Sequence, residues 1–306
     1  MTSASSDQTP FRSGFVALVG RPNAGKSTLT NALCGQKVAI TSDTPQTTRH
    51  RLRAIVDRPD LQLIIVDTPG IHKPHDALGD ELNTSALKAL EDVDVACLLI
   101  DATKPVGTGD VWVAEQLRRL HCRKVLVITK VDISDPAQVA AQLEAARALA
   151  DFDDEIVVSA VEGFNVEGFI ACVGRYMPEG PRWFPEGMGT DQPLEVVVAE
   201  FIREKILLKT RDEVPHSVGV QVATMTQDAR KDLVRIYADI YVERDSQKGI
   251  VIGRGGSLLK EVGTEARADL ERLLGSKVYL DLNVKVKKDW RRDATQVRRF
   301  GYGEGL

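Results

Sequence analysis

The sequence contains few cysteines, and none of them lies in a pattern typical of a metal or redox site. The chain has 306 residues and four cysteines, and no two of the four form a C-x-x-C pair. This spacing gives no support to a zinc site or a dithiol redox centre. Free thiols suit a reducing compartment, so we expect a cytoplasmic protein. The cysteines are Cys34, Cys97, Cys122 and Cys172.

Long apolar runs are also missing from the sequence. The first apolar segment, residues 15–20 (FVALVG), is far too short for a signal peptide or a membrane span. The opening residues are polar, and we expect residues 1–12 to be a disordered tail. Hydrophobic residues make up 43% of the chain, enough for one large core or two modest ones. The composition therefore predicts a globular protein.

The charge is nearly balanced overall, but it is unevenly distributed. The formal net charge is −4, which by itself argues neither for nor against a nucleic-acid partner. The segment from Lys248 to Arg299 nevertheless carries thirteen Lys and Arg against seven Asp and Glu. A basic segment of this kind fits either an anionic partner or a solvated surface.

The first part of the chain alternates short apolar runs with helical patterns. The runs are continuous rather than alternating, as in a parallel sheet covered on both faces. Residues 51–67 differ, because a short R-P-D turn joins two strands there and indicates one antiparallel pair. We therefore expect a mostly parallel, doubly wound α/β domain over residues 13–178. Its strands are expected near residues 15–20, 61–67, 95–101, 124–130 and 155–160.

The order of elements changes after residue 178. Residues 179–193 are dense in proline and glycine, which is typical of a linker. Beyond it the pattern predicts a helix, two strands, a short helix, a glycine-rich loop, a long helix and a final strand. We expect residues 194–306 to form a second, smaller α+β domain.

Residues 20–27 (GRPNAGKS) match the phosphate-binding pattern G-x-x-x-x-G-K-[ST], with a strand before them and a helix after them. Glycines allow backbone N–H groups to close around an anion, and the helix N-terminus adds partial positive charge. Lys26 can reach the β- and γ-phosphates, and the Ser27 hydroxyl suits Mg²⁺. The residues expected to bind nucleotide here are Gly20, Arg21, Pro22, Asn23, Ala24, Gly25, Lys26, Ser27 and Thr28.

Three later segments make the chain resemble the P-loop GTPases: DTPG (67–70), TKVD (129–132) and the pair Ser159-Ala160. A carboxylate at Asp132 can accept two hydrogen bonds from guanine, whereas adenine lacks that donor pair. Thr129 stands where the family usually has Asn, and its hydroxyl can still bond to the phosphate loop. The resemblance implies nucleotide-binding roles for Asp67, Thr68, Pro69, Gly70, Thr129, Lys130, Val131, Asp132, Ser159 and Ala160.

The same resemblance implies a mechanism. The segment 46–51 (QTTRHR) occupies the first switch, and relatives with a T-R pair favour Thr48 over Thr47 as the residue that completes the Mg²⁺ shell. Ile71 replaces the glutamine that orients water in many GTPases, so we expect slow GTP hydrolysis. His72 and His75 are expected to be exposed switch residues. The implied catalytic residues are Lys26, Thr48 and Gly70. The implied Mg²⁺ ligands are Ser27, Thr48 and Asp67. Asn23 is a candidate K⁺ ligand.

The second glycine-rich loop, Gly253–Gly256 (GRGG), has no G-K-[ST] and lies between two helices. With its flanking elements it resembles the G-x-x-G loop of a KH domain, whose slim backbone presses on a sugar-phosphate chain. Lys285 and Lys287 alternate along one strand and equally fit a solvated sheet surface. The residues proposed to bind RNA are Gly253, Arg254, Gly255, Gly256, Lys260, Lys285 and Lys287.

Together with the C-terminal RRFGY (298–302), these motifs resemble the Era family of bacterial GTPases over nearly the whole chain. The resemblance implies a ribosome-assembly GTPase that binds GTP, GDP, the 3′ end of small-subunit ribosomal RNA and the 30S subunit. It also implies a loose peripheral contact with the inner face of the cell membrane, for which the residues give no separate signal. We expect a monomer.

Two other functions stay open from the sequence. One is an RNA chaperone with a vestigial nucleotide site, against which Lys26, Ser27, Asp67 and Asp132 argue because all four are intact. The other is a GTPase that acts on a different partner, such as tRNA or a membrane surface.

Overall fold

The computed structural model describes residues 10–44, 47–50, 52–68, 76–228, 230–300 and 302. The chain divides into two compact units, and neither is continuous in sequence. The first unit is drawn from Met1–Val38, Leu52–Thr68 and Leu87–Asp191. The second is drawn from Ala39–Arg51, Pro69–Ala86 and Gln192–Leu306. Two segments that lie early in the sequence therefore pack with the C-terminal part of the chain.

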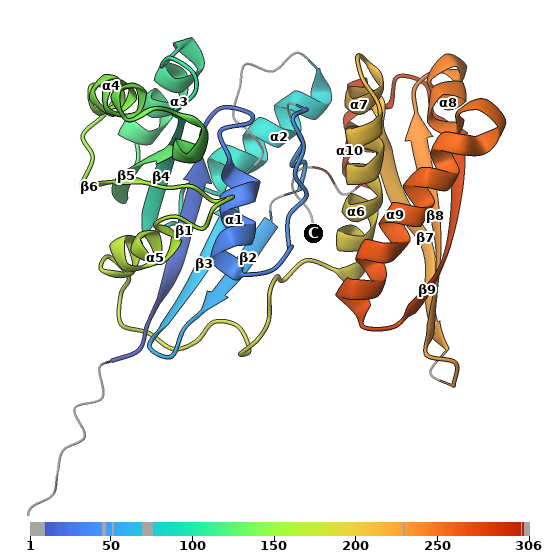
Figure 1. Ribbon diagram of the computed structural model, residues 1–306, viewed down its shortest axis with the longest axis horizontal. Helices are drawn as coiled ribbons and strands as arrows, with labels where there is room; N and C mark the ends of the chain where they lie inside the picture. The colour runs from blue at the N-terminus through green and yellow to red at the C-terminus, as the bar shows by residue number, and fades with distance from the viewer. Residues whose placement is uncertain are drawn as a thin grey trace, which may run out of the picture. The chain divides into compact units, whose positions relative to one another are not determined.

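The first unit is built on a six-stranded sheet with the order β2-β3-β1-β4-β5-β6 (Figure 1). All neighbouring strands are parallel except β2 and β3, which pair antiparallel. Both the mostly parallel sheet and the antiparallel pair confirm the prediction from sequence. The strands are β1 (Arg12–Val19), β2 (Leu52–Asp57), β3 (Leu61–Asp67), β4 (Val95–Asp101), β5 (Arg123–Thr129) and β6 (Asp154–Val157).

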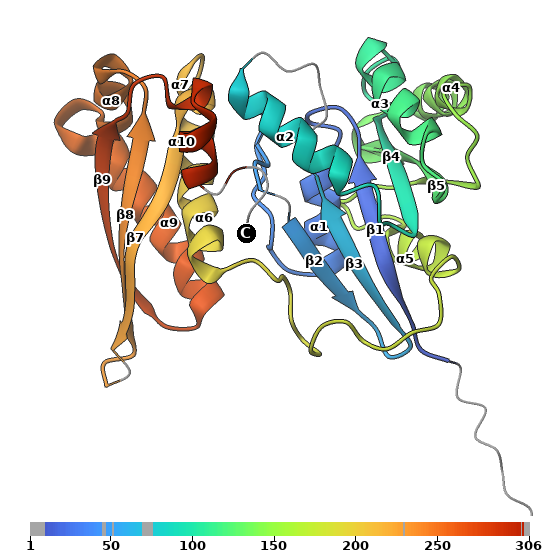
Figure 2. The ribbon, with the colours of Figure 1, turned by 180° about the vertical axis from the view of Figure 1, so that it is seen from behind.

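Helices cover this sheet on both faces, which explains the continuous apolar runs. Every residue of β3 and β4 is buried. Helices α1 and α5 lie in front of the sheet in Figure 1, and α3 lies in front of it in the opposite view of Figure 2. The elements are α1 (Lys26–Cys34), α3 (Thr108–Arg118), η1 (Val131–Ile133), α4 (Pro136–Arg147) and α5 (Val166–Gly174). Helix α2 (Ala77–Lys88) begins in the second unit and ends in the first.

Local sequence signals place the ends of these helices. Helix α4 begins with Pro136, and the preceding Asp135 accepts a hydrogen bond from the backbone N–H of Gln138 at 2.8 Å. Helix α1 ends at Gly35, whose φ of 65° is left-handed. An Asp before a helix, a Pro at its first position and a Gly after its last are the residue types that favour these helix ends.

The proline- and glycine-rich segment after α5 is attached to the first unit over most of its length. It forms isolated bridges from Glu179 to Arg12 and from Thr190 to Ala54. The buried Gln62 side chain accepts from the backbone N–H of Trp183 at 2.8 Å and donates to the carbonyl of Phe184 at 2.9 Å. The segment is thus docked on the sheet, a feature that its composition did not indicate.

The second unit contains a three-stranded sheet with the order β7-β8-β9. Strand β7 is antiparallel to β8, and β8 is parallel to β9. Helix, two strands, helix, glycine loop, helix and strand follow one another as the sequence predicts. The elements are α6 (Leu194–Lys209), α7 (Val214–Ser217), β7 (Gly219–Asp228), β8 (Leu233–Val242), α8 (Asp245–Ile252), η2 (Arg254–Gly256), α9 (Ser257–Leu274), β9 (Lys277–Val286), η3 (Trp290–Arg292) and α10 (Ala294–Arg299).

The core of the second unit lies between this sheet and helices α6 and α9, which run together over one face (Figure 1). Alternate residues of β8, from Val234 to Val242, are buried against these helices. The intervening residues therefore belong to the opposite face of the sheet. A smaller apolar cluster joins α2 to the C-terminal segment through Leu78, Leu82, Trp290, Val297, Phe300 and Tyr302.

Candidate functional site

The phosphate-binding loop connects β1 to α1 at the carboxyl edge of the first unit's sheet. Gly20 leaves no room for a side chain, because a Cβ there would lie 2.7 Å from the carbonyl oxygen of Leu99. Asn23 and Gly25 have left-handed backbones with φ of 64° and 91°. The loop is therefore a tight backbone structure that ends at the N-terminus of α1, the place where helices bind anions.

Lys26 is buried in this loop and bonds to the loop itself. Its side-chain amine donates to the carbonyl oxygens of Gly20 at 3.1 Å and Arg21 at 2.9 Å. Burial lowers the Lys26 pKa to about 8, against the opposing effect of Asp67. A phosphate in the loop would supply the anionic partner that these two carbonyl groups replace only in part.

Ser27 and Asp67 form the second half of the site. The Ser27 hydroxyl donates to Asp67 Oδ2 at 2.7 Å. Burial raises the Asp67 pKa to about 6, although Lys26 and Ser27 act in the opposite direction. Asp67 Oδ1 is buried and has no hydrogen-bond partner within the described residues. A hydroxyl and a carboxylate with a free oxygen suit Mg²⁺, which completes its shell with water and phosphate oxygens.

The predicted base-binding segments lie at the same edge of the sheet. The Thr129 hydroxyl donates to the carbonyl oxygen of Ala24 at 2.8 Å, so the expected bond between this residue and the phosphate loop is present. Lys130 has a left-handed backbone with φ of 59°, and its ammonium pairs with Asp101 at 2.8 Å. Asp132 follows on an exposed turn. Its carboxylate is accessible to a ligand.

Ser159 shapes the last of these segments. Its backbone N–H donates to the carbonyl of Phe164 at 3.1 Å, and its hydroxyl accepts from the N–H of Glu162 at 3.1 Å. These bonds close a turn directly after β6, with the half-buried Ala160 in it. The segments after β1, β5 and β6 and the end of β3 at Asp67 thus meet where ligands bind in open parallel sheets.

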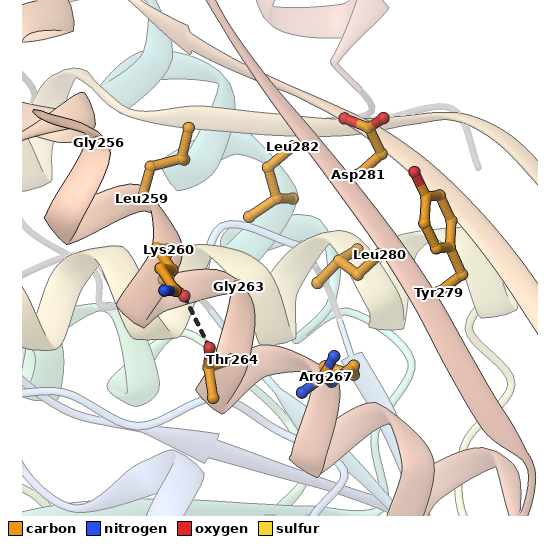
Figure 3. Close-up of a pocket in the computed structure, with 10 residues that line it drawn as sticks. All are labelled: Gly256, Leu259, Lys260, Gly263, Thr264, Arg267, Tyr279, Leu280, Asp281 and Leu282. Atoms are coloured by element: carbon orange, nitrogen blue, oxygen red, sulfur yellow. Dashed lines mark hydrogen bonds between the residues drawn. The ribbon is translucent and has the colours of Figure 1, made fainter.

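In the second unit, a groove of about 600 Å³ runs between α9 and the edge strand β9 (Figure 3). Figure 3 shows Leu280 and Leu282 pointing from β9 toward α9, which carries Lys260 and Arg267. The groove thus combines an apolar floor with basic side chains. Its lining residues are Gly256, Leu259, Lys260, Gly263, Thr264, Arg267, Tyr279, Leu280, Asp281 and Leu282.

The glycine loop lies at one end of this groove, between α8 and α9. Gly253, Gly255 and Gly256 all have left-handed φ, at 74°, 60° and 80°. A Cβ on Gly253 would lie 2.8 Å from the backbone nitrogen of Leu258. The loop is therefore as slim as its sequence predicts, and the N-terminus of the 18-residue helix α9 follows it directly.

Comparisons with known proteins give a family match in each of the two parts of the chain. Residues 15–130 match the family described as 50S ribosome-binding GTPase, and residues 213–291 match the KH domain family. The GTPase Era of Mycobacterium avium (strain 104) is 52% identical over 298 residues, which cover 96% of this chain and all of that protein. The GTPase Era of Mycolicibacterium smegmatis is 51% identical over the same coverage. The chain belongs to the Era family of GTPases.

Two crystal structures of Era proteins extend this likeness to the whole fold. One is an Aquifex aeolicus Era variant bound to GDP.AlF4-. The other is Era in complex with MgGDPNP and nucleotides 1506–1542 of 16S ribosomal RNA. Each is 38% identical to this chain, covers 96% of it and 100% of the solved chain, and has a TM-score of 0.92.

Some predicted site residues of this Era-family chain fall outside the described residues. These are Pro69 and Gly70, together with the switch residues Gln46, Arg51, Ile71, His72 and His75. Thr68 is described and buried, and its hydroxyl donates to the carbonyl of Leu18 at 3.0 Å. The roles assigned to Pro69 and Gly70 stay predictions.

The first-switch threonines belong to the second unit. The Thr47 hydroxyl donates to the carbonyl of Thr44 at 2.6 Å and bonds to the Ser42 hydroxyl at 2.7 Å. Thr47 is thus occupied within its own loop. The role of Thr48 as a Mg²⁺ ligand rests on the family resemblance and stays a prediction.

Arg49 anchors this loop in the second unit, a role that sequence reasoning missed. It is 2% exposed and donates to the carbonyls of Val218 at 2.6 Å and His216 at 2.9 Å. Its guanidinium lies 5.8 Å from the Trp290 ring centroid and 5.5 Å from that of Tyr302. The T-R pair is therefore also an attachment between the switch segment and the C-terminal segment.

The predicted RNA-binding residues divide into two groups. Gly256 and Lys260 line the groove, and Gly253, Arg254 and Gly255 form the loop at its end. Lys285 instead pairs with Asp239 at 2.7 Å, and Lys287 lies 5.3 Å from the Phe300 ring centroid. Both of these lysines have partners within the chain and do not line the groove. Sequence reasoning missed Arg267, which lies seven residues, about two helical turns, after Lys260 on the same face of α9.

Proposed function

We propose that this chain binds and hydrolyses GTP and binds the 3′ end region of small-subunit ribosomal RNA. The bound nucleotide controls the affinity for this RNA. Through this binding the protein assists assembly of the small subunit. The observation that carries the proposal is the presence of two different phosphate-binding glycine loops in one Era-family chain, one at each site. The Era complex with MgGDPNP and 16S RNA supports it, because that protein binds both kinds of ligand together.

At the nucleotide site, the backbone N–H groups of residues 20–28 and the N-terminus of α1 would bind the phosphates. Lys26 would exchange its bonds to Gly20 and Arg21 for bonds to the β- and γ-phosphates. Ser27 and Asp67 would hold Mg²⁺, which neutralises the charge that develops on the phosphates. The orphaned oxygen of Asp67 would then gain a partner.

Guanine recognition would come from the segments after β5 and β6. The accessible carboxylate of Asp132 would accept two hydrogen bonds from guanine, and the stem of Lys130 would lie over the base. The backbone N–H of Ala160 would donate to guanine O6. Adenine reverses this donor and acceptor pattern, so it would leave Asp132 unpaired.

Hydrolysis would be slow, because an aliphatic residue follows the D-x-x-G segment and cannot orient water. We propose catalytic roles for Lys26, Thr48 and Gly70. K⁺ bound beside Asn23 would add positive charge near the phosphates, which turnover in KCl and NaCl tests directly. Equal rates in the two salts would remove K⁺ from the mechanism.

The groove between α9 and β9 would bind single-stranded RNA. A slim loop next to a helix N-terminus fits a sugar-phosphate backbone, and exposed bases can pack on the floor formed by Leu280 and Leu282. Lys260, Arg267 and Arg254 would make salt-dependent phosphate contacts. We extend this proposal to the 30S subunit, where the same RNA end is presented.

We propose the division of the chain that its sequence indicates: a tail over 1–12, a GTPase domain over 13–178, a linker over 179–193 and a KH domain over 194–306. A monomer in solution is also proposed, and sedimentation tests it.

Within the described residues, no helix has both the length and the apolar character needed to cross a membrane. A peripheral membrane contact in the cytoplasm is proposed from family resemblance, and co-flotation with anionic vesicles tests it.

The decisive experiment compares nucleotides and variants in one assay. Single-turnover hydrolysis of GTP and ATP is measured for the purified protein, for Asp132→Ala and for the control Asp151→Ala, which changes an exposed carboxylate. We expect GTP alone to be hydrolysed, with a loss of about tenfold or more in GTP affinity for Asp132→Ala only. Crosslinking to ribosomal RNA follows, and sequencing identifies the bound end. Hydrolysis of neither nucleotide would favour the vestigial-site chaperone, and crosslinks to tRNA would favour the other partner.

A further inference from the structure

Two exposed tyrosines lie side by side on the sheet of the second unit, on the face opposite α6 and α9. Tyr237 of β8 is 40% exposed and Tyr279 of β9 is 44% exposed. Their ring centroids are 6.0 Å apart, with the planes tilted by 58°. The parallel register places Arg235 opposite Tyr279, and its guanidinium lies 5.5 Å from the Tyr279 ring centroid. The three side chains form what we call the tyrosine platform: Tyr237, Tyr279 and Arg235.

The chain itself covers the other end of this face. Tyr241 packs edge-to-face on Phe300 with centroids 4.9 Å apart, and Lys287 lies over both rings. Helix α10 lies at that end of the sheet in Figure 2. Asp239, between the two ends, pairs with Lys285 at 2.7 Å. The C-terminal segment thus buries one aromatic group and leaves the tyrosine platform open to solvent.

The tyrosine platform is continuous with the RNA groove. β9 is the edge strand of the sheet, and its side chains alternate between the two faces. Figure 3 shows Leu280 and Leu282 directed toward α9. Tyr279 and Asp281 are directed to the other side of the strand. Both of these residues also line the groove. A polymer that leaves the groove therefore needs to cross a single strand, roughly 5 Å wide, to reach the platform.

We propose that single-stranded RNA held in the groove continues over β9 onto the tyrosine platform, where Tyr279 and Tyr237 each stack on a base. The inference rests on the proposed RNA-binding function and adds a second, base-stacking subsite to it. Exposed aromatic faces bind bases of any sequence, and a guanidinium behind one ring strengthens the stack. Asp281 and Asp239 share this face, so bases rather than phosphates lie against it, with the backbone toward solvent.

The experiment uses the full chain and three RNAs. One is a segment of the ribosomal 3′ end of about five nucleotides, enough to fill a KH groove. The other two carry the same segment with five further nucleotides at one end or the other. Affinities are measured for the wild type, for the double variant Tyr237→Ala/Tyr279→Ala and for the matched control Tyr237→Phe/Tyr279→Phe. The Phe pair keeps both rings and loses only the hydroxyl groups.

We expect one of the two extensions to raise wild-type affinity by roughly tenfold or more, a gain that the Ala pair loses and the Phe pair keeps. All variants should hydrolyse GTP at the wild-type rate, and the Phe pair should bind the short RNA as the wild type does. Because Tyr279 also lines the groove, the Ala pair is scored by the ratio of its affinity for the extended RNA to its affinity for the short RNA. An extension gain that persists in the Ala pair overturns the platform, as does the absence of any gain in the wild type. A change in self-association without a change in RNA affinity also overturns it, in favour of a second copy of the chain.

A failure of the proposed function gives a different result. In that case the wild type binds none of the three RNAs, and Lys260→Ala has no effect on any of them. Mapping of ultraviolet crosslinks provides an independent readout. We expect crosslinked bases at Tyr237 with the extended RNA only, and at the groove residues, Tyr279 included, with both RNAs.

Discussion

Two carboxylates, Asp67 in the first unit and the largely buried Glu200 in the second, have opposite surroundings. Asp67 in the first unit is fully buried, burial raises its pKa to about 6, and its Oδ1 has no hydrogen-bond partner in the part of the chain that the structure describes. Glu200 in the second unit also loses water, but Arg203 and then His50 and Arg49 outweigh that effect and lower its pKa. Arg203 donates to Glu200 Oε1 at 2.8 Å and also bonds to the carbonyl of Thr47.

The difference separates a binding site from a structural ion pair. The chain supplies Glu200 with its cation, so this charge stabilises the attachment of residues 47–50 to α6. Among the described residues, Asp67 receives one hydrogen bond from the Ser27 hydroxyl and the electrostatic effect of Lys26, and its Oδ1 has no partner. A bound cation would complete its surroundings. A buried charged group that lacks a full set of partners therefore indicates the functional site, whereas a buried charged group with its counter-ion does not.

The largest effect on activity should come from removing Lys26, the cation of the phosphate-binding loop. We expect Lys26→Ala to lower single-turnover GTP hydrolysis by about 100- to 1,000-fold, because Lys26 is positioned for the transferred phosphate. The control is Lys104→Ala, which changes an exposed lysine of the same unit. A loss of less than threefold in Lys26→Ala would show that the P-loop is not a working phosphate site.

The next largest effect should come from breaking the ion pair between Glu200 and Arg203. We expect Glu200→Gln to destabilise the second unit by about 3 kcal/mol at pH 7, since it leaves Arg203 buried without its anion. The pKa of Glu200 is lowered from 4.5 in the folded state, against the effect of burial and mainly by Arg203. Its contribution to the stability of the fold is therefore present above pH 4.5 and is lost as the pH falls through the lowered pKa. Hydrogen exchange of the α6 amides at pH 7 and pH 4 measures both effects.

Glu195→Gln provides the control for this experiment, because Glu195 is exposed on the same helix. It should change the stability by at most about 0.5 kcal/mol. The difference in stability between wild type and Glu200→Gln should shrink at low pH. A difference that stays constant down to pH 3 would contradict the assignment of Glu200 as the stabilising anion.

A smaller effect of opposite sign is expected at Asp67. Without metal or nucleotide, Asp67→Asn should stabilise the first unit by about 1 to 2 kcal/mol at pH 7.5, because it removes a carboxylate whose ionised form is disfavoured by burial. The folded pKa is raised, so the favourable contribution of Asp67 exists below pH 3.8 and is lost as pH rises through about 6. The advantage of the Asn variant should therefore shrink as pH falls from 6 toward 4.

Urea unfolding in the presence of a metal chelator measures this change, with Asp60→Asn as the control at an exposed carboxylate. The same Asp67 variant should lose Mg²⁺-dependent GTP hydrolysis. A variant that is less stable than wild type at pH 7.5 would remove the contrast between the two carboxylates.

The smallest effect concerns the RNA groove, where the charges are exposed. Lys260→Ala should weaken RNA binding by about threefold at physiological salt and reduce the salt slope by about 0.7, the loss of one phosphate contact. Lys285→Ala should have less effect, because Asp239 already pairs with that ammonium at 2.7 Å. Equal losses in the two variants would show that Lys285 leaves Asp239 for RNA.

Much of the nucleotide site was predictable because it is local. The positions of Gly20, Gly25, Lys26 and Ser27 are fixed by a short stretch of backbone, and only glycine tolerates the close approach at Gly20. The alternation of apolar runs and helical patterns likewise gave the parallel sheet and the order of the second unit. Thr129 was expected to bond to the phosphate loop, and its hydroxyl does so.

The rest depends on pairings between distant residues. Arg49 and Val218 are 169 positions apart, so no local pattern could show that Arg49 is anchored there. The pairing of Lys285 with Asp239 follows from the register of two parallel strands, which sequence did not give. Glu200 and Arg203, two charged residues three positions apart inside an apolar helical run, were the sequence signal of this ion pair.

The measurement that tests the central claim most directly is the affinity for a ribosomal 3′-end RNA with different bound nucleotides. The full chain is titrated with labelled RNA in the presence of MgGDPNP, MgGDP or an MgATP analogue at one fixed salt concentration. The account predicts tighter RNA binding with MgGDPNP than with MgGDP and no response to the ATP analogue. Identical affinities in all three conditions would contradict it, because the two sites would then act independently.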